Sequence, residues 1–594
     1  MTVTYTLVPE SPEAHIFKVT IDVDDPIPDG QHFSLPNWIP GSYMIRDFSK
    51  NIVSLAAFSH GQPVQLHKLH KSGWCTEAGL DHVRLEYTVY AWDLSVRTAH
   101  LDNEHGFFNG TSVFVMADGH EHDTHSVNML APHANVCANW QVATSMTATD
   151  VNQQGFGVYT SADYDELIDH PVEMGTFERI EFSACGVAHE VILTGEYHTD
   201  NQRIAADLKT ICEAQIKFFG EPAPVDRYVF LVMVVGNGYG GLEHRASTAL
   251  LITREHLPAP GDETVSEKYL SFLGLCSHEY FHTWNVKRIK PAEFVPYKLD
   301  AESYTRLLWF FEGITSYYDD LFLVRTGLIT PEQYFDLMSK TITRVRRGAG
   351  RLVQNVTDSS FDAWNKFYKQ DANAPNAIVS YYAKGALVSL CLDAEIRRAT
   401  NNEKSLDDLM QLLWQQWLQT GKGLGEREPE QLASKIAGTD LSAFFQHALY
   451  TTDALPLEQS LQYLGVEMQW RARKSTSDSG GGKEGIDENI DALPWLGANV
   501  NGSVVTHVFA GMAAEQAGLA PGDTLVAIDR LTIDGDDVPD LLKRHANSKN
   551  VMVHYSRHGV LRESVLPIMG APVDTCSLKA IKDQPVLWPQ VVTA

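Results

Sequence analysis

The feature that most constrains this chain is a His-Glu-x-x-His pattern inside a run whose apolar residues recur at helical spacing. The pattern is His278-Glu279-Tyr280-Phe281-His282. Residues four apart lie on one face of an α-helix, so His278 and His282 can aim their imidazoles at one ion. Two imidazoles and a carboxylate from elsewhere suit tetrahedral Zn²⁺ with an open fourth position. The pattern therefore predicts a catalytic zinc helix, in which Glu279 takes a proton from the attacking water.

These residues also fit an ordinary surface helix with two solvated histidines, so the rest of the chain must supply a third ligand. Glu312 stands among bulky apolar residues, and burying a charge is costly unless it is paired or ligates a metal. We predict that Glu312 is the third ligand; the alternative is a helix-end acid with its carboxylate in water. Asp319, two turns further along the same face, is a candidate to bond the free ring nitrogen of a ligand histidine.

Two further stretches carry candidate site residues. A buried strand predicted at 227–235 ends in a glycine-rich segment, where Gly240 and Gly241 precede Glu243. Glycines allow close backbone approach by a ligand. A phosphate loop is excluded because the segment lacks the required glycine and lysine spacing. Tyr382 opens a later helix; a tyrosine near zinc stabilises an oxyanion, although packing is the alternative explanation.

Length and patterning predict two to four domains for the 594 residues. Residues 1–170 alternate apolar and polar positions, as half-buried strands do. Residues 171–455 mix strand and helix and then become helical. Residues 456–570 indicate a small α/β module with a mobile, polar loop at 473–490. Residues 571–594 are expected to form a tail.

Charge and cysteine content bound the partners and the compartment. The formal net charge of −28 argues against nucleic acid or an anionic membrane as partner. The stretches of apolar residues are all shorter than a membrane span, and the first residues lack the pattern of a signal peptide. The seven cysteines are scattered and form no Cys-x-x-Cys pair. We therefore expect reduced thiols and a cytoplasmic location.

Three local predictions concern the surroundings of these motifs. Thr264 and Glu267 have the spacing of a capping box at the start of the zinc helix. Lys287 and the arginine after it lie near the expected end of that helix, where cations offset its dipole. The turn at 38–43, followed by Arg46 and Asp47, is expected to be a buried corner with an ion pair rather than a substrate contact.

The motifs, taken together, resemble those of a known group of enzymes. His278-Glu279-x-x-His282 with Glu312-Gly313-x-Thr315-x-Tyr317 resembles the gluzincin metallopeptidases. Gly240-Gly241-Leu242-Glu243-His244 is similar to the Gly-x-Met-Glu-Asn motif of the aminopeptidase N and leukotriene A4 hydrolase relatives. Tyr382-Ala383-Lys384-Gly385 resembles the Tyr-x-Lys-Gly of the same relatives.

Two other stretches narrow the resemblance to one family. Residues 513–529 resemble a PDZ domain of the bacterial type, and a gluzincin core followed by a PDZ domain is the layout of the glycyl aminopeptidase family. The residues after the zinc helix, 284–288, also look like that family. The implied fold is multidomain α+β: a β-rich N-terminal domain, a thermolysin-like mixed or helical catalytic domain, and a C-terminal PDZ-like domain.

The resemblance implies a zinc aminopeptidase with one Zn²⁺ per chain. His278, His282 and Glu312 would hold the metal. Tyr382 would donate to the oxyanion, and Glu243 on its glycine edge would bind the free α-amine of a peptide. A preference for small N-terminal residues such as glycine or alanine is also implied.

This sequence departs from the aminopeptidase N pattern in two places. The 29 residues between His282 and Glu312 form a longer segment, so we expect an insertion there. His244 stands where asparagine is expected, so the amine site rests on Glu243 itself.

Two other functions compete with this hypothesis. A zinc endopeptidase with PDZ-captured substrates would keep the metal site but would not need Glu243. A non-catalytic PDZ scaffold on a peptidase fold would need neither. In either case the PDZ groove would bind a C-terminal peptide by strand addition, with residues 495–498 as the candidate carboxylate loop.

Overall fold

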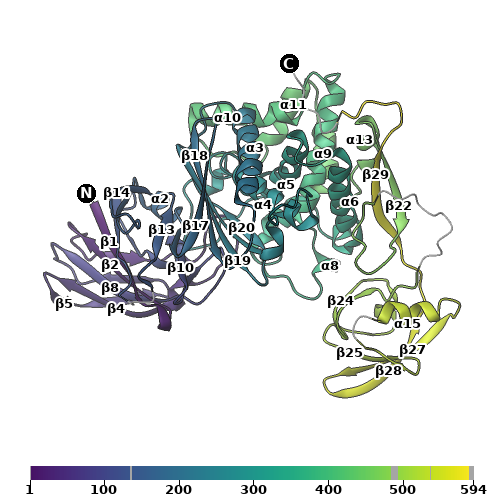
Figure 1. The fold of residues 1–594 in the computed structure, drawn as a ribbon, viewed down its shortest axis with the longest axis horizontal. Helices are drawn as coiled ribbons and strands as arrows, with labels where there is room; N and C mark the ends of the chain where they lie inside the picture. Colours follow the sequence, from purple (N-terminus) through teal and green to yellow (C-terminus); the bar gives the residue numbers. More distant parts are fainter. Residues whose placement is uncertain (1, 134–136, 483–492, 535–536, 588–594) are drawn as a thin grey trace. The chain divides into compact units, whose positions relative to one another are not determined.

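The computed structural model describes residues 2–133, 137–482, 493–534 and 537–587, and the chain divides into two compact units (Figure 1). The first unit contains residues 1–304 and 413–424. The second contains residues 305–412 and 425–594. Each unit combines sheets with helices, which confirms the predicted multidomain α+β organisation with a β-rich N-terminal part, a helical catalytic region and a C-terminal β-sheet part.

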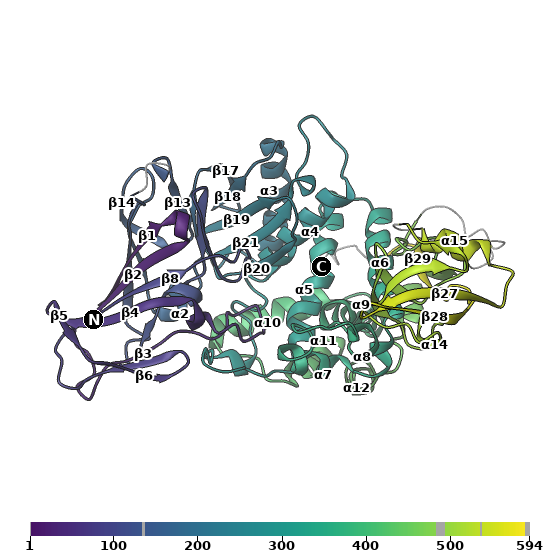
Figure 2. The same cartoon turned by 90° about the horizontal axis from the view of Figure 1, so that it is seen from below.

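The N-terminal part of the first unit is built on an eight-stranded sheet, ordered β14-β15-β12-β1-β2-β8-β4-β5. The outer strands are β14 (Thr147–Val151), β15 (Gly157–Ser161), β12 (Thr124–Met129), β4 (Ile52–Ser59) and β5 (Gln62–Val64). At its centre, β1 (Thr2–Ser11), β2 (Ile16–Val23) and β8 (Val83–Tyr90) are antiparallel neighbours. Along β2 and β8 every second side chain is buried, which is the pattern that the sequence predicts. Two four-stranded sheets complete this β-rich part (Figure 2).

A five-stranded mixed sheet, ordered β17-β18-β19-β21-β20, forms the other half of the first unit. The central β19 (Arg227–Val235) is nearly continuous in buried residues, because it has parallel partners on both sides, β18 (Val187–Gly195) and β21 (Ser247–Thr253). The edge strand β20 (Gly240–Glu243) runs antiparallel to β21. The helices α3 (Asn201–Phe219) and α4 (Glu267–Phe281) belong to the same unit.

Helix α4 carries the His-Glu-x-x-His pattern, and its start differs from the prediction. Ser266 is the N-cap residue, and its hydroxyl accepts a hydrogen bond from the Tyr269 amide at 3.1 Å. Thr264, the predicted cap, instead donates to Asp262 Oδ1 at 2.7 Å. The N-cap residue therefore lies two positions after the predicted one. Thr264 does not cap the helix because Asp262 binds its hydroxyl.

In the second unit, α5 (Leu308–Arg325) and α9 (Tyr381–Ala399) pack against each other along their length, as both views show (Figure 2). Around them lie shorter helices and α6 (Pro331–Arg347), which begins with a capping box at Thr330 and Gln333. Residues Ala374–Ala399 are long and apolar enough to cross a membrane, but 78% of their most apolar window is buried inside the protein. Such burial is typical of the core helix of a globular domain.

The expected tail at 571–594 is partly ordered, which corrects the sequence prediction. β29 (Val573–Ala580) pairs antiparallel with β22 (Val466–Ala472), and β29 packs on α6 (Figure 1). The first part of the predicted mobile loop is held as well, because Arg473 pairs with Asp574 at 3.0 Å and its guanidinium lies 3.9 Å from the Trp495 ring centroid. Residues 483–490 of that loop lie outside the described residues.

The C-terminal module of the second unit is a sheet ordered β23-β24-β25-β27-β28, with β26 pairing β25. Four of these strands are β25 (Thr524–Ile528), β26 (Leu531–Thr532), β27 (Asn550–Arg557) and β28 (Val560–Pro567). Its elements include β23 (Ala498–Asn501), β24 (Val504–Val508) and α15 (Val538–Arg544). A separate hydrophobic core holds it together, in which Leu496, Val553 and Leu566 are buried. This sheet and α15 lie within residues 456–570, where the sequence predicts a small α/β module.

Candidate active site

The two histidines of α4 lie together at its C-terminal end. Their Nε2 atoms are 3.1 Å apart. The Nδ1 atom of His282 lies 2.7 Å from the carbonyl oxygen of Asn285. A carbonyl only accepts, so Nδ1 carries the proton and the Nε2 of neutral His282 keeps its lone pair. The Nε2 atom of His282, which faces His278, can therefore bind a cation. Two imidazole nitrogens are ligands that suit Zn²⁺.

The turn after α4 fixes that carbonyl in place. Val286 has φ +128°, a conformation that a β-branched residue adopts only when its surroundings impose it. The Arg288 guanidinium donates to three carbonyl oxygens, those of Thr283, Arg245 and Pro224. Lys287 is buried, and its ammonium lies 2.8 Å from Asp169 Oδ1. These two cations therefore stabilise the turn through direct contacts. The sequence predicts only an interaction with the helix dipole, which is less than the structure shows.

Asp169 contacts several polar groups beside this turn. It is a residue of the site that was not predicted from the sequence. Its carboxylate contacts Lys287, His244 Nδ1 at 3.0 Å and Arg245 at 3.3 Å. Burial would raise the pKa of Asp169, but these partners outweigh burial and hold it well below its ordinary value. His244 is buried and bonded to Asp169, which explains a histidine at that position.

Glu279 and Glu243 approach the histidines within the first unit. Glu243, Glu279 and His282 are all buried, and each has a ligand-type atom within 4.8 Å of the others. Glu243 is the last residue of β20, where it stands opposite Thr248 of β21. The structure thus brings together the predicted general base, one predicted metal ligand and the predicted amine-binding carboxylate.

Two glycines allow these carboxylates to lie directly on main chain. A Cβ added to Gly241 would come 2.1 Å from Glu279 Oε1. A Cβ added to Gly41 would come 2.6 Å from both carboxylate oxygens of Glu243, and Gly41 has φ +92°. A Cβ added to Gly240, by contrast, would meet Arg97 Nη2 first, at 3.9 Å. Of Gly240 and Gly241, Gly241 is therefore the residue whose packing requires a glycine.

Gly41 belongs to the predicted turn at 38–43, which the segment between His282 and Glu312 holds in place. The Asn37 amide donates to the Leu299 carbonyl at 2.8 Å, and Trp38 Nε1 donates to the Lys298 carbonyl at 2.7 Å. The Tyr43 ring stacks on Phe294 with centroids 5.8 Å apart. Residues 294–299 of this segment thus hold the turn at 38–43 in place, next to Glu243.

The turn at 38–43 only partly matches the prediction. It is a buried corner, as expected, with Trp38 and Tyr43 at most 1% exposed. Arg46 donates to Ser42 Oγ at 2.6 Å, and Asp47 pairs with Lys71, so the expected Arg46–Asp47 pair is replaced by these contacts. Because Gly41 touches Glu243, the corner also reaches the candidate site.

The second unit carries Glu312 and Tyr382. Glu312 is 1% exposed on α5, and Tyr382 is the second residue of α9. The two helices approach so closely that a Cβ on Gly313 would come 2.5 Å from Gly385 Cα. Burial, followed by the negative charge of Glu312, raises the pKa of Tyr382 well above its ordinary value. Tyr382 is therefore a protonated donor at neutral pH.

Asp319, the predicted bonding partner of a ligand histidine, is half-buried on α5. Its Oδ1 accepts a hydrogen bond from the Asp320 amide at 2.6 Å. The ring nitrogen of His282 that a second carboxylate would bond is occupied by the Asn285 carbonyl. The role of Asp319 toward His278 stays a prediction.

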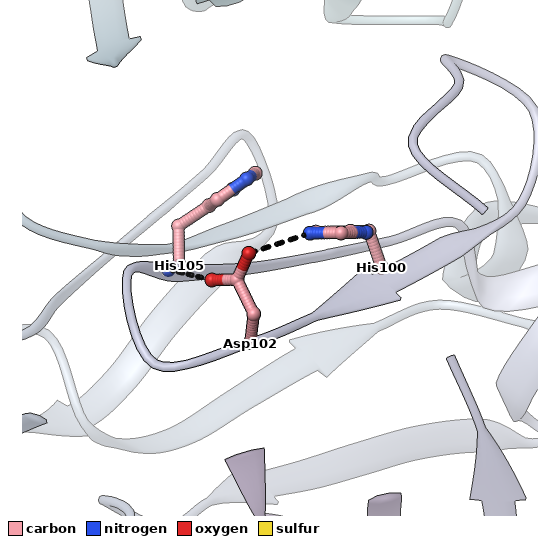
Figure 3. Close-up of side chains that lie close together, drawn as sticks. All are labelled: His100, Asp102 and His105. Carbon is pink, nitrogen blue, oxygen red and sulfur yellow. Dashed lines mark hydrogen bonds and ion pairs between the residues drawn. The ribbon is translucent and has the colours of Figure 1, made fainter. Parts of the chain in front are cut away.

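A second group of ligand-type residues lies in the N-terminal part, on the hairpin of β9 (Ala99–Leu101) and β10 (His105–Phe108). Figure 3 shows Asp102 between His100 and His105. His100 Nε2 lies 3.0 Å from Asp102 Oδ2, and Oδ1 accepts from the His105 amide at 2.9 Å. His105 Nδ1 lies 3.0 Å from Glu173. These bonds account for the cluster as a hydrogen-bonded turn.

Comparison with known proteins agrees with this site and fold. Residues 4–176 match the peptidase M61 N-terminal domain, and residues 271–388 match the M61 glycyl aminopeptidase domain. No curated protein matches the chain. A solved aminopeptidase N family protein from Idiomarina loihiensis is 39% identical over 100% of both chains, with a TM-score of 0.95. An M1 zinc metallopeptidase from Deinococcus radiodurans is 16% identical over 77% of this chain and 95% of its own, with a TM-score of 0.48.

The chain is thus an enzyme of the peptidase class. More narrowly, it belongs to the M61 glycyl aminopeptidase family, as the resemblance of its motifs implies.

Proposed function

We propose that this enzyme is an aminopeptidase that releases small N-terminal residues, glycine or alanine, from peptides with a free N-terminus. The observation that carries the proposal is the buried Glu243 carboxylate beside Glu279 and His282. A buried carboxylate forms strong, charge-assisted hydrogen bonds with a cation, and the α-ammonium of a peptide is such a cation. An ammonium held there leaves the first peptide bond beside Glu279.

The proposed metal site consists of His278, His282 and Glu312, with one Zn²⁺ per chain. Two imidazoles and a carboxylate form a candidate ligand set. The hydrogen bond from His282 Nδ1 to Asn285 supports this assignment, because it directs the Nε2 lone pair toward the other histidine. Bound Zn²⁺ would supply a Lewis acid for the scissile carbonyl and make water acidic enough to attack it.

The remaining steps belong to side chains of this chain. Glu279 accepts the proton of the attacking water and returns it to the leaving amine. Tyr382, protonated because of its raised pKa, donates a hydrogen bond to the developing oxyanion. Gly241 allows Glu279 to sit against the main chain of β20, so the base is held close to the bond that breaks.

The preference for small first residues is supported by the packing of Gly41. Its main chain lies against the Glu243 carboxylate and is held there by residues 294–300. The side chain of a bound N-terminal residue projects from the carbon between the ammonium and the carbonyl. Main chain already occupies the space beside Glu243, so a short side chain fits better than a long one.

Hydrolysis of aminoacyl chromogenic amides tests this function. We expect cleavage of glycyl and alanyl amides, loss with a chelator, and recovery with Zn²⁺. Leucyl and phenylalanyl amides should be poorer substrates, and N-acetylated amides should not be cleaved. Glu243→Gln should lower kcat/KM on free amines by about 100-fold or more, since it removes a buried charge pair.

The same panel distinguishes the alternatives. An endopeptidase would cleave N-blocked internal peptides, and Glu243→Gln would leave that activity intact. A non-catalytic scaffold would show no chelator-sensitive hydrolysis, and Glu279→Ala would change nothing. Either result would replace the aminopeptidase proposal.

For the C-terminal module we propose a PDZ-type role, the binding of a peptide C-terminus, with residues 495–498 as the carboxylate loop. The five-strand order with α15 supports it. We also propose a cytoplasmic location. The seven cysteines are all free and five of them are buried, which supports a reducing compartment.

A further inference from the structure

A cavity of about 510 Å³ lies within the second unit. Its lining comes mainly from α6, α9, α13 (Leu457–Tyr463) and β22, the elements labelled in Figure 1. Its volume is in the range of small-molecule sites. The apolar part of its lining includes Ile342, Leu387, Leu455 and Met468. The amine-binding and water-activating residues of the candidate active site do not line it.

Three cations belong to the polar lining of this cavity. Lys384 comes from α9, Arg346 from α6, and Arg351 from the short helix that follows α6. Arg346 extends over the Trp470 ring at 5.4 Å, and Arg351 Nε donates to the Arg346 carbonyl at 3.2 Å. The two guanidinium groups are thus tied to the cavity wall.

Lys384 is the unusual member of this group. It is only 3% exposed, although lysine is rarely buried without a partner. Among the residues that the structure describes, no carboxylate lies within ion-pair distance of its ammonium. Burial, followed by the positive charge of Arg351, lowers the pKa of Lys384 to about 8. The amine is therefore still protonated at neutral pH, and its charge is only partly compensated.

The carboxylates of the lining compensate that charge only in part: the negative charge of Asp453 acts to raise the pKa of Lys384, but burial and Arg351 outweigh it. Asp453 and Glu458 are exposed residues at the rim, where water screens their charge. Asp453 is also 3.7 Å from His447. A buried cation facing an apolar cavity is stabilised when a ligand brings an anion to it.

We propose that this cavity binds a carboxylate attached to an apolar group, of the size of one or two amino acid residues. The carboxylate would meet Lys384 and Arg351, and the apolar group would lie on Leu387, Ile342 and Met468. Two sources share this chemistry: the C-terminus of a peptide and a free apolar amino acid.

Calorimetric titration of the full chain with N-acetyl-leucyl-phenylalanine tests the proposal. The acetyl group removes the ammonium that the active site would bind, so the probe reports on a carboxylate site. We expect saturable binding of the acid, and binding of its C-terminal amide at least about tenfold weaker, because hydrogen bonds to a charged group are lost. Equal binding of acid and amide, or no binding of the acid at millimolar concentration, would overturn the proposal.

Variants assign the binding to this cavity. Lys384→Met should weaken binding of the acid at least about tenfold while keeping or raising Tm, because it removes a buried charge without a partner. Arg351→Gln gives a second variant with the same expected loss if Lys384→Met does not fold, because Arg351 is the other cation that the carboxylate would meet. Lys435→Met, an exposed lysine on α11 (Glu428–Ala437), is the matched control and should bind as the unmodified chain does. Unchanged binding in both cavity variants would place the probe elsewhere and overturn the assignment.

Two further measurements distinguish a peptide C-terminus from a free amino acid as the ligand, and this cavity from the active site as the place of binding. Free phenylalanine that binds as tightly as the blocked dipeptide, and depends on Lys384, assigns the cavity to amino acids; weaker binding assigns it to peptide C-termini. Glu279→Ala should bind the acid normally, so the result does not depend on whether the aminopeptidase proposal holds. Loss of binding in Glu279→Ala would show that the probe occupies the active site and would overturn the assignment.

Discussion

Gly313 and Gly385 are in main-chain contact where α5 crosses α9. A Cβ on Gly313 would come 2.5 Å from Gly385 Cα, and one on Gly385 would come 2.8 Å from Gly313 Cα. Each glycine stands next to a candidate site residue or within one turn of it: Gly313 follows Glu312, and Gly385 lies three residues after Tyr382. The contact therefore sets how near the buried carboxylate comes to the phenol.

Gly313→Ala should disturb both stability and chemistry. The added methyl meets backbone, which cannot rotate away, so the helices must separate. We expect a loss of about 1–3 kcal/mol in the free energy of unfolding, measured by urea titration, and a lower kcat on a glycyl amide. Gly425→Ala is the control, because its Cβ would meet only Glu428 Oε2 at 3.8 Å. Similar behaviour of the two variants would mean that the helix contact is not required.

Gly241→Ala should impair catalysis more than stability. The methyl would come 2.1 Å from Glu279 Oε1, so the side chain of the base must move. A displacement of about 1 Å in a reacting group can lower the rate about 100-fold, and we expect a loss of that order in kcat with bound Zn²⁺ retained. Metal analysis and steady-state kinetics check the two parts. Gly240→Ala, with 3.9 Å of clearance, should cost much less; an equal loss would contradict the proposed contact.

The chemical side chains could be predicted from the sequence because their signals are local. His278, Glu279 and His282 share one helical turn and a half, and Glu312 and Tyr382 stand in short motifs of their own. Helix α4 and the alternating strands β2 and β8 follow from periodicity in the same way. These patterns need no knowledge of distant partners.

The contacts that hold the site residues in place could not be predicted, because each joins residues that are far apart in the chain. Lys287 and Asp169 are 118 residues apart, and neither has a distinctive neighbourhood. Gly41 gives no sign in the sequence that it meets Glu243. The strand β29 lies in a short C-terminal segment whose partner, β22, is about a hundred residues earlier, so the segment alone looks like a tail.

Gly41→Ala tests the link between the N-terminal turn and Glu243. The methyl would press on both carboxylate oxygens, so we expect KM for a glycyl amide to rise more than kcat falls. Gly61→Ala controls for backbone strain, since Gly61 has φ +78° in the same β-rich part and nothing within 4 Å of an added Cβ. If both variants lose stability but only Gly41→Ala raises KM, the turn contributes to substrate binding. Unchanged KM in Gly41→Ala would refute that role.

Asp169→Asn should be strongly destabilising. The carboxylate is buried against Lys287 and Arg245; its loss removes the partner of the buried Lys287 and one of the two carboxylates that pair with Arg245. We expect a decrease of about 3–5 kcal/mol in the free energy of unfolding near neutral pH. Asp165→Asn removes a carboxylate from the same Arg245 at a site that is 46% exposed, and it should cost less than about 1 kcal/mol.

The pH dependence of the Asp169→Asn effect gives the sign of the pKa shift. Because the folded-state pKa of Asp169 is lowered, its contribution is present above the pKa of the unfolded chain, about 4, and is lost as pH falls toward the folded value. The stability difference between the unmodified chain and Asp169→Asn should therefore be constant from pH 7 to about pH 5 and shrink below about pH 4. Urea titrations across this range measure it. A difference that grows on acidification would mean that burial, rather than Lys287 and Arg245, dominates at Asp169.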